Sequence, residues 1–292
     1  MFQINMSYHN IDVVIKSLSI FDTEYKIIKH LKITPKRAIY LCSSNNELKV
    51  LKFFIKSNIS EEQRNIFKFY NNLSHPNFCK INKIFEINMF YVIDMEYIDG
   101  ITMDKYYANY LIPEINENKS GDSYNKSSII YNNYVIIFDL LLSLEYIHNK
   151  GLIHGDIKPS NIIINKDNKP VIIDYDLGKY VSDEIVVSKN YFGTFVYISP
   201  ELIYNSIFNT KTDIWSLGMT FINCIIDNKD IFNYENINDL IRYIVDKKKQ
   251  YGRLFINLIH VMCTYDYTLR PSSKELIMIL KKSKFMKQHY NL

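Results

Sequence analysis

The sequence contains few of the residues that break or bend a polypeptide chain. Its 292 residues include 8 glycines and 7 prolines, less than half of the roughly 12% that average usage gives for the two together. Collagen-like and flexible low-complexity chains are therefore excluded. Hydrophobic residues make up 47% of the chain and aromatic residues 14%, which is enough apolar surface to offset the entropy of ordering it. The sequence predicts a globular protein with a large core.

Cysteine, net charge and long apolar runs are also scarce. The four cysteines stand far apart along the chain: Cys42, Cys79, Cys224 and Cys263. Without a C-x-x-C pair, zinc sites and disulfide frameworks have no support, and buried thiols are expected. The net charge of +4 is too small to indicate nucleic-acid binding. The first twenty residues lack a signal-peptide core and the apolar stretch 134–144 is broken by Asp139, so we expect a cytoplasmic protein without membrane contact.

The first third of the chain has the pattern of a small antiparallel sheet. Short β-rich runs predict strands at residues 25–28, 38–41, 48–55, 81–87 and 90–95. Ser60 and Gln63 form a capping box ahead of one apolar helical face. The first glycine, Gly100, marks a change of composition. We expect an N-terminal extension at 1–21, a small lobe at 22–98 and a second lobe at 99–292.

The second lobe is predicted to be mainly helical. The helical pattern begins after Met103 and is interrupted at 116–128, where Asn, Ser and Lys predict a solvated loop insertion. Further helices are predicted at residues 129–148, 213–226, 237–248 and 272–282.

A cluster of polar residues follows the long apolar helix. The run from His154 to Asn161 is H-G-D-I-K-P-S-N, and a short hairpin then leads to Asp174. This arrangement predicts that Asp156, Lys158, Asn161 and Asp174 lie together. Carboxylate and amide oxygens can bind magnesium, a second carboxylate can accept a hydroxyl proton, and an ammonium can neutralise a phosphoryl group. The pattern indicates magnesium-assisted phosphoryl transfer.

These residues resemble the catalytic loop of the protein kinase family, H-R-D-x-K-x-x-N, in which a metal-binding Asp follows the Asn by about 13 residues. The similarity extends to the segments 193–201 and 213–218 and to Arg270, and it covers roughly residues 22–285. It implies an α+β, bilobal protein-kinase fold, with a small antiparallel β-sheet lobe carrying one helix, a larger mainly helical lobe, and ATP in the cleft between them. It also implies a buried ion pair between Glu201 and Arg270.

The resemblance assigns roles to individual residues. Asp156 would be the catalytic base, Lys158 would stabilise the transferring phosphoryl group, and Lys52 would position the ATP phosphates. Mg²⁺, with Mn²⁺ as an alternative, would be held by Asn161 and Asp174. The remaining ATP-binding positions would be Leu31, Ile39, Met95, Glu96 and Ile98. Lys158 together with Thr194 is the combination of Ser/Thr kinases, so a monomeric kinase acting on Ser or Thr of a protein substrate is expected.

Two departures from the family pattern affect the nucleotide site. No glycine precedes Gly100, so the glycine-rich phosphate loop is missing; either Lys32, Lys36 or Arg37 binds phosphate with its side chain, or these residues decorate a solvated turn. The helix Glu that pairs with the strand lysine falls at Ile66. Glu62, one turn earlier, either replaces it or is a first-turn carboxylate favoured by the helix dipole.

Other departures concern the second lobe and the activity. Gly155 replaces the family arginine that answers a phosphate on the activation segment, so activity independent of segment phosphorylation is predicted. The metal motif is 174–176, D-Y-D, although a shifted register would use 176–178, D-L-G. His-Gly-Asp also resembles the vaccinia-related kinases, which leaves the subfamily open. The alternative function is a pseudokinase that acts as a nucleotide-binding, scaffolding or regulatory protein, while a small-molecule kinase is disfavoured by the segment 193–201.

Overall fold

The computed structural model describes residues 25–111, 123–181, 186–187, 195–226, 239–240, 251–283 and 286–287. The chain divides into two compact units, Met1–Ile98 and Asp99–Leu292. We call them the N-terminal unit and the C-terminal unit and describe each by itself. The predicted extension at 1–21 lies outside the described residues.

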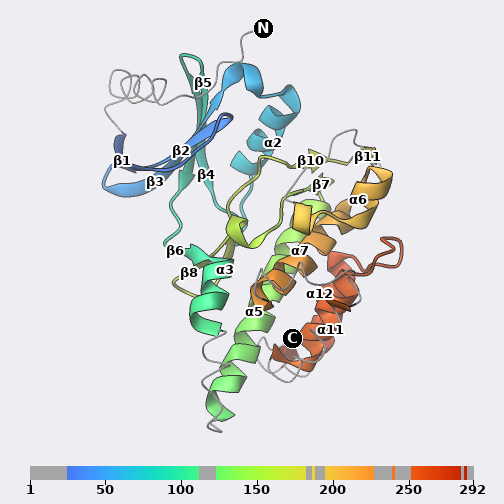
Figure 1. The fold of residues 1–292 in the computed structure, drawn as a ribbon. Helices are drawn as coiled ribbons and strands as arrows, with labels where there is room; N and C mark the ends of the chain where they lie inside the picture. Colours follow the sequence, from blue (N-terminus) through green and yellow to red (C-terminus); the bar gives the residue numbers. More distant parts are fainter. Residues whose placement is uncertain are drawn as a thin grey trace. The chain divides into compact units, whose positions relative to one another are not determined.

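The N-terminal unit is built on a five-stranded antiparallel sheet in the order β1-β2-β3-β5-β4 (Figure 1). The strands are β1 (Lys26–Ile33), β2 (Arg37–Ser44), β3 (Glu47–Ile55), β4 (Ile81–Ile87) and β5 (Phe90–Glu96). Between β3 and β4 lie a short 3₁₀ turn, η1 (Lys56–Asn58), and the helix α2 (Glu61–Asn71). The predicted sheet is thus confirmed, and among residues 25–98 it carries one α-helix, as predicted.

Asparagine makes the tight turns of this sheet. Asn45 and Asn46 join β2 to β3 with φ values of 49° and 65°, and Asn88 joins β4 to β5 with a φ of 48°. Two successive positive φ values suit a two-residue hairpin that follows the twist of the strands. Asparagine is the residue other than glycine that most readily takes this left-handed conformation. The hairpins therefore form although the unit contains no glycine.

The helix α2 begins where the sequence predicts it. The Ser60 hydroxyl accepts a hydrogen bond from the Gln63 amide, and the Gln63 side chain accepts one from the Ser60 amide. This capping box satisfies two amides that the first turn leaves unpaired. The helix buries Ile66, Phe67 and Tyr70 and packs against β4.

The C-terminal unit is mainly helical (Figure 1). Its α-helices are α3 (Met103–Tyr106), α5 (Ser123–His148), α6 (Pro200–Asn205), α7 (Thr210–Ile225), α11 (Arg253–Met262) and α12 (Ser273–Lys282), with a π-helical turn η2 (Tyr107–Leu111) after α3. Within this unit α5 packs against α12 and α7 packs against α11. The predicted helix at 237–248 lies almost wholly outside the described residues.

Short strands and turns complete this unit. They are β6 (Gly100–Thr102), β7 (Leu152–Ile153), η4 (Pro159–Asn161), β8 (Ile162–Asn165), β9 (Pro170–Ile172), β10 (Lys179–Tyr180), β11 (Val186–Val187), η5 (Phe195–Tyr197) and β12 (Ile207–Phe208). The strands form three small sheets, ordered β6-β8-β9, β10-β7 and β11-β12. The first sheet contains the β8–β9 hairpin, which leads directly to the metal motif at residues 174–176.

The boundary of α5 corrects one prediction. The solvated loop was predicted at 116–128, but α5 already begins at Ser123, so residues 123–128 are helical. No glycine or proline lies between 123 and 148. Because adding residues to an existing helix is much easier than starting one, polar residues without a breaker extend a strongly apolar helix.

The core of the C-terminal unit packs closely around α7. A Cβ atom added to Gly218 would lie 2.6 Å from the Cys263 Sγ atom and 3.1 Å from the Met262 Cβ atom, so this glycine permits a close helix contact. All four cysteines are buried thiols that form no disulfide bond, as predicted. Burial raises the pKa of the Cys42 and Cys263 thiols to about 12. Among the described helices, none combines the length and apolar character needed to cross a membrane.

Candidate active site

The predicted catalytic residues of the C-terminal unit lie together on one loop. Asp156, Lys158 and Asn161 follow β7, and Pro159 begins the turn η4. The Lys158 Nζ atom lies 2.7 Å from the Asp156 Oδ2 atom. The Asn161 Nδ2 atom donates to the same Oδ2 at 2.8 Å and to the Asp156 backbone carbonyl at 2.9 Å. The side-chain contacts of Asp156 within the described residues therefore converge on one carboxylate oxygen, and Oδ1 is left for another partner.

A buried carboxylate on α7 fixes the backbone of this loop. The Asp213 Oδ2 atom accepts the His154 amide at 2.8 Å, and its Oδ1 atom accepts the Gly155 amide at 2.9 Å. The His148 Nε2 atom, at the end of α5, also lies 2.9 Å from Asp213 Oδ2, a contact that the sequence did not predict. The Asp213 carboxylate is fully buried, so three hydrogen bonds compensate for its desolvation.

The β8–β9 hairpin brings Asn161 and Asp174 to the same place. Ile162 pairs with Ile172, and one step further the Ile173 amide donates to the Asn161 carbonyl at 3.0 Å. Asp174 follows directly, is 8% exposed, and accepts the Asp176 amide at 3.3 Å through Oδ1.

These two residues fit a magnesium ion. Both Nδ2 hydrogen bonds of Asn161 go to Asp156, so its Oδ1 atom faces away from Asp156. The Asn161 amide oxygen and the Asp174 carboxylate together are a set of hard oxygen donors. Among the described residues no group of three or more His, Cys, Asp or Glu side chains could hold a metal. A two-residue site of this kind suits Mg²⁺, which usually keeps waters and substrate phosphates among its ligands.

His154 is a buried structural residue of the same loop. Its Nδ1 atom accepts the Asp156 amide at 3.2 Å, and its ring meets the Tyr175 ring edge-on at 6.2 Å. Burial lowers the pKa of His154, and the nearby Asp213, Asp156 and Asp174 carboxylates oppose this shift only in part. The imidazole is therefore neutral at physiological pH and holds the loop without adding charge.

The predicted nucleotide residues lie in the N-terminal unit. Lys52 on β3 is only 5% exposed and stands between Ile39 on β2 and Ile93 on β5. Burial raises the pKa of the Cys79 thiol, the Glu96 carboxylate adds to the rise, and the Lys52 ammonium opposes it.

The other predicted ATP-binding residues differ in exposure. Met95 is buried, Ile39 and Ile98 are half-buried, and Leu31 is 46% exposed beside a bulge in β1. Glu96 also has a structural task, because its carboxylate accepts the Lys80 amide at 2.7 Å and its carbonyl accepts the Cys79 thiol at 3.5 Å.

The turn between β1 and β2 replaces the missing glycine-rich loop. The Thr34 amide donates to the Arg37 carbonyl at 2.9 Å, and the Arg37 amide donates to the Thr34 hydroxyl at 3.1 Å. Pro35 has no amide hydrogen. Lys36 is thus the one residue of this turn whose amide is not used by it, so the backbone offers no cradle for phosphates. The sequence could not show this closure by Thr34.

Glu62 does not supply a buried partner for Lys52. It lies exposed in the first turn of α2, while Ile66, at the family's Glu position, is 1% exposed. Within the described residues no ion pair joins Glu62 to Lys52. The hypothesis of replacement is therefore wrong, and Glu62 is the helix-dipole carboxylate that the sequence offered as the other possibility.

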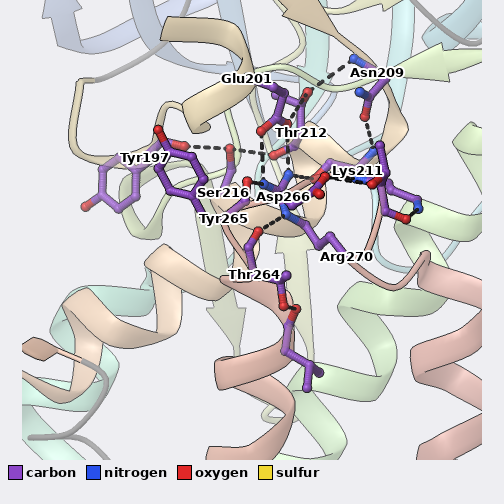
Figure 2. A network of polar contacts seen from close by, with 12 residues as sticks. Tyr197, Glu201, Asn209, Lys211, Thr212, Ser216, Thr264, Tyr265, Asp266 and Arg270 are labelled. Atoms are coloured by element: carbon purple, nitrogen blue, oxygen red, sulfur yellow. Dashed lines mark hydrogen bonds and ion pairs between the residues drawn. The ribbon is translucent and has the colours of Figure 1, made fainter. Parts of the chain in front are cut away.

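The predicted pair of Glu201 and Arg270 is confirmed. Two parallel hydrogen bonds join them, from Nη1 to Oε1 at 2.8 Å and from Nη2 to Oε2 at 2.9 Å. Figure 2 shows the surrounding network, in which Arg270 also donates to the carbonyls of Thr264, Lys211 and Tyr265. The Trp215 ring lies 5.0 Å from the guanidinium carbon. Gly193 and Thr194, which precede this network in sequence, lie outside the described residues.

Comparison with known proteins identifies the family. Residues 38–283 match the model of the protein kinase domain, so the chain belongs to this family. It is 31% identical over 180 residues to the serine/threonine-protein kinase D1044.8 of Caenorhabditis elegans, a stretch that is 60% of this chain and 17% of the relative. It is 28% identical over 175 residues to mouse serine/threonine-protein kinase Nek1, covering 60% of this chain and 13% of Nek1.

A third relative is covered over a larger share of both proteins. The chain is 26% identical over 217 residues to the putative serine/threonine-protein kinase A of Trypanosoma brucei brucei, which is 71% of this chain and 47% of that protein. The chain thus spans less than half the length of these curated relatives. The match places their shared kinase domain on this chain, and it confirms the bilobal α+β fold class that the motifs implied.

Proposed function

We propose that this protein is a Ser/Thr protein kinase that transfers the γ-phosphate of ATP to a protein hydroxyl. The observation that carries the proposal is the contact set of Asp156, in which Lys158 and Asn161 both bind Oδ2 and leave Oδ1 to accept a proton. The names of the relatives, which are serine/threonine-protein kinases, support the acceptor class.

In the proposed reaction a substrate hydroxyl is oriented by Asp156. Its oxygen forms a bond to the γ-phosphorus as the bond from that phosphorus to the bridging oxygen breaks, ADP leaves, and the hydroxyl proton passes to Asp156. The Lys158 ammonium, 2.7 Å from Asp156, would neutralise charge on the transferring group. Lys52 would position the phosphates of ATP.

Asn161 and Asp174 would hold Mg²⁺, with Mn²⁺ as an alternative. The bound ion would neutralise phosphate charge. The register with Asp174 as ligand is supported by the hydrogen bond between the Ile173 amide and the Asn161 carbonyl, which brings Asp174 beside Asn161. Asp176 is two residues further along the chain.

A pseudokinase is the second candidate, and the glycine-free turn at Thr34 favours it. The Thr34 and Arg37 amides are used within the turn and Pro35 has none, so a backbone cradle for phosphate is missing. The catalytic loop favours an enzyme instead, because every residue that would touch metal or the acceptor hydroxyl is present and held in place.

The experiment is transfer of labelled γ-phosphate from ATP to the protein itself and to a basic Ser/Thr substrate, with Mg²⁺ and with Mn²⁺. Asp156→Asn and Asp174→Asn are expected to abolish transfer, and Asp176→Asn serves as the matched control that keeps it. Loss in the Asp176 variant with transfer retained in the Asp174 variant would establish the shifted register. Absence of transfer from the folded wild-type protein would favour a pseudokinase or an enzyme that requires a partner.

A further inference from the structure

The backbone at Gly155 leaves no room for a side chain. Gly155 has a φ of +77°, which residues with a side chain rarely adopt, and it immediately precedes Asp156. A Cβ atom added there would lie 2.7 Å from the Leu177 carbonyl oxygen and 2.9 Å from the Phe208 Cζ atom. Because contacts this short do not occur in proteins, an arginine could stand here only if the loop or Phe208 moved.

Phe208 is the side chain that closes this position. It lies on β12, is fully buried, and forms an apolar cluster with Ile153 at the start of the catalytic loop and Leu202 on α6. Val181 and Ile198 pack against the cluster. One ring therefore contacts the strand before the loop, and its tip faces the loop itself.

The same residue connects the loop to the residues that follow the metal motif. In the β11–β12 sheet Phe208 pairs with Val186, and Ile207 pairs with Val187. On the other side the Lys179 Nζ atom lies 5.8 Å from the centre of the Phe208 ring, and Lys179 pairs with Ile153. Phe208 thus touches or pairs with residues both before and after Asp156.

We propose that Phe208 is a positioning residue that fixes the catalytic loop at Gly155 by apolar contact and holds the strand Val186–Val187 beside it through the backbone pairing of β12 with β11. The proposal rests on the proposed function in that the loop it fixes carries Asp156. It adds to that function the way in which the strand Val186–Val187 is held beside the catalytic loop. Neither the apolar packing of Phe208 nor the backbone pairing of β11 with β12 needs a phosphate, so the loop and β11 stay joined in the unphosphorylated protein.

Hydrogen exchange tests the anchor without requiring catalysis. The amides to follow are those of His154 and Gly155, which donate to Asp213, and those of residues 186–187. The protein is treated with phosphatase and compared as wild type, Phe208→Leu and the control Tyr204→Leu. Tyr204 is an aromatic residue of α6 that is 73% exposed. Far-ultraviolet circular dichroism and the melting temperature establish that each variant is folded.

Phe208→Leu is expected to speed exchange at both pairs of amides by about tenfold or more, whereas Tyr204→Leu leaves them unchanged. If Phe208→Leu does not fold, Gly155→Ala gives the same test, because its Cβ atom would displace the ring or the Leu177 carbonyl. Exchange in Phe208→Leu equal to that in the control would overturn the proposal. So would protection of residues 186–187 that is lost when phosphate is removed.

Transfer kinetics separate this proposal from the proposed function. In an active kinase Phe208→Leu is expected to lower kcat by about tenfold while KM for ATP stays within about twofold, because Phe208 acts on the loop of Asp156. If the wild type transfers no phosphate, the proposed function fails and the exchange result still decides the anchor. If the wild type is active and neither exchange nor kcat changes in Phe208→Leu, the anchor alone fails.

Discussion

Arg270 and Glu201 form a two-pronged ion pair in which both side chains are almost completely buried, with 0% and 2% of their side-chain surface exposed. The remaining donors of the guanidinium go to backbone carbonyls, and the Thr212 hydroxyl donates to the carboxylate at 3.3 Å. The pair joins α6 to the loop that precedes α12. Its two residues are 69 positions apart, so it links distant parts of the C-terminal unit.

We predict that Glu201→Gln lowers the free energy of unfolding by about 3–5 kcal/mol, because the Arg270 charge stays buried without a counter-ion. Chemical denaturation followed by circular dichroism measures this change. The matched control is Lys166→Ala, which breaks an ion pair with Asp99 whose side chains are 76% and 59% exposed and should cost less than about 1 kcal/mol. Equal losses in the two variants would contradict the structural role of the buried pair.

The turn at Thr34 leads to a prediction about ATP affinity. Since its backbone is used within the turn, phosphate binding there must come from side chains, and we expect Lys36→Ala and Arg37→Ala each to weaken ATP binding by about five- to tenfold. Titration calorimetry at two salt concentrations measures the dissociation constant. Lys29→Ala on β1 is the control for general loss of positive charge. An unchanged dissociation constant for ATP in both turn variants would contradict phosphate binding by these side chains.

Glu62→Gln is expected to leave kcat and KM for ATP unchanged, since Glu62 lies exposed in the first turn of α2. Only the small favourable interaction with the helix dipole is lost. Steady-state phosphate transfer measures both constants, with Lys52→Met as the variant that should lose activity. A loss of kcat/KM in Glu62→Gln as large as that in Lys52→Met would restore Glu62 as the partner of Lys52.

The buried His154 makes stability depend on pH. Burial lowers its pKa in the folded protein below the ordinary value of about 6.5, so the unfolded chain takes up a proton that the folded one does not. The stabilisation is complete above the unfolded pKa and is lost as the pH falls through this value towards the folded pKa. Denaturation midpoints at pH 7.5 and 5.5 measure the loss. His154→Gln should show a smaller difference between the two, and an equal difference would assign the effect to other groups.

Phosphorylation of the segment after the metal motif should not control activity. Gly155 replaces the arginine that would answer a phosphate, so we expect the triple variant Ser182→Ala, Ser188→Ala and Tyr191→Phe to keep kcat within about threefold of wild type. Phosphatase-treated wild type is the companion sample. A loss of tenfold or more in both would show that a phosphate on these residues is required.

The sequence predicted the parts of this fold that depend on local pattern and on motif spacing. Three features could be predicted from the sequence: the strands of the small sheet, the capping box at Ser60, and the pair of Glu201 and Arg270. Alternation of apolar residues, capping chemistry and motif residues can each be recognised along the chain. The predicted start of α5 was wrong by six residues, because nothing in residues 123–128 distinguishes a helical extension from a polar loop.

The contacts that join distant residues could not be predicted. The hydrogen bond from His148 to Asp213 and the approach of Phe208 to Gly155 both depend on tertiary placement. The Gly155 substitution was visible in the sequence, but its positive φ and the ring that faces it were not. A missing side chain does not by itself show what fills its place.

The asparagine turns of the small sheet also affect the denatured chain. Glycine gives a denatured chain more conformations to lose on folding than any other residue. Because Asn45, Asn46 and Asn88 occupy the left-handed positions, the denatured N-terminal unit has fewer conformations to lose than it would with glycine there. Each of these asparagines adopts its left-handed native conformation at a higher energy than glycine would. Part of this unit's stability therefore comes from the smaller number of conformations that its unfolded chain can adopt.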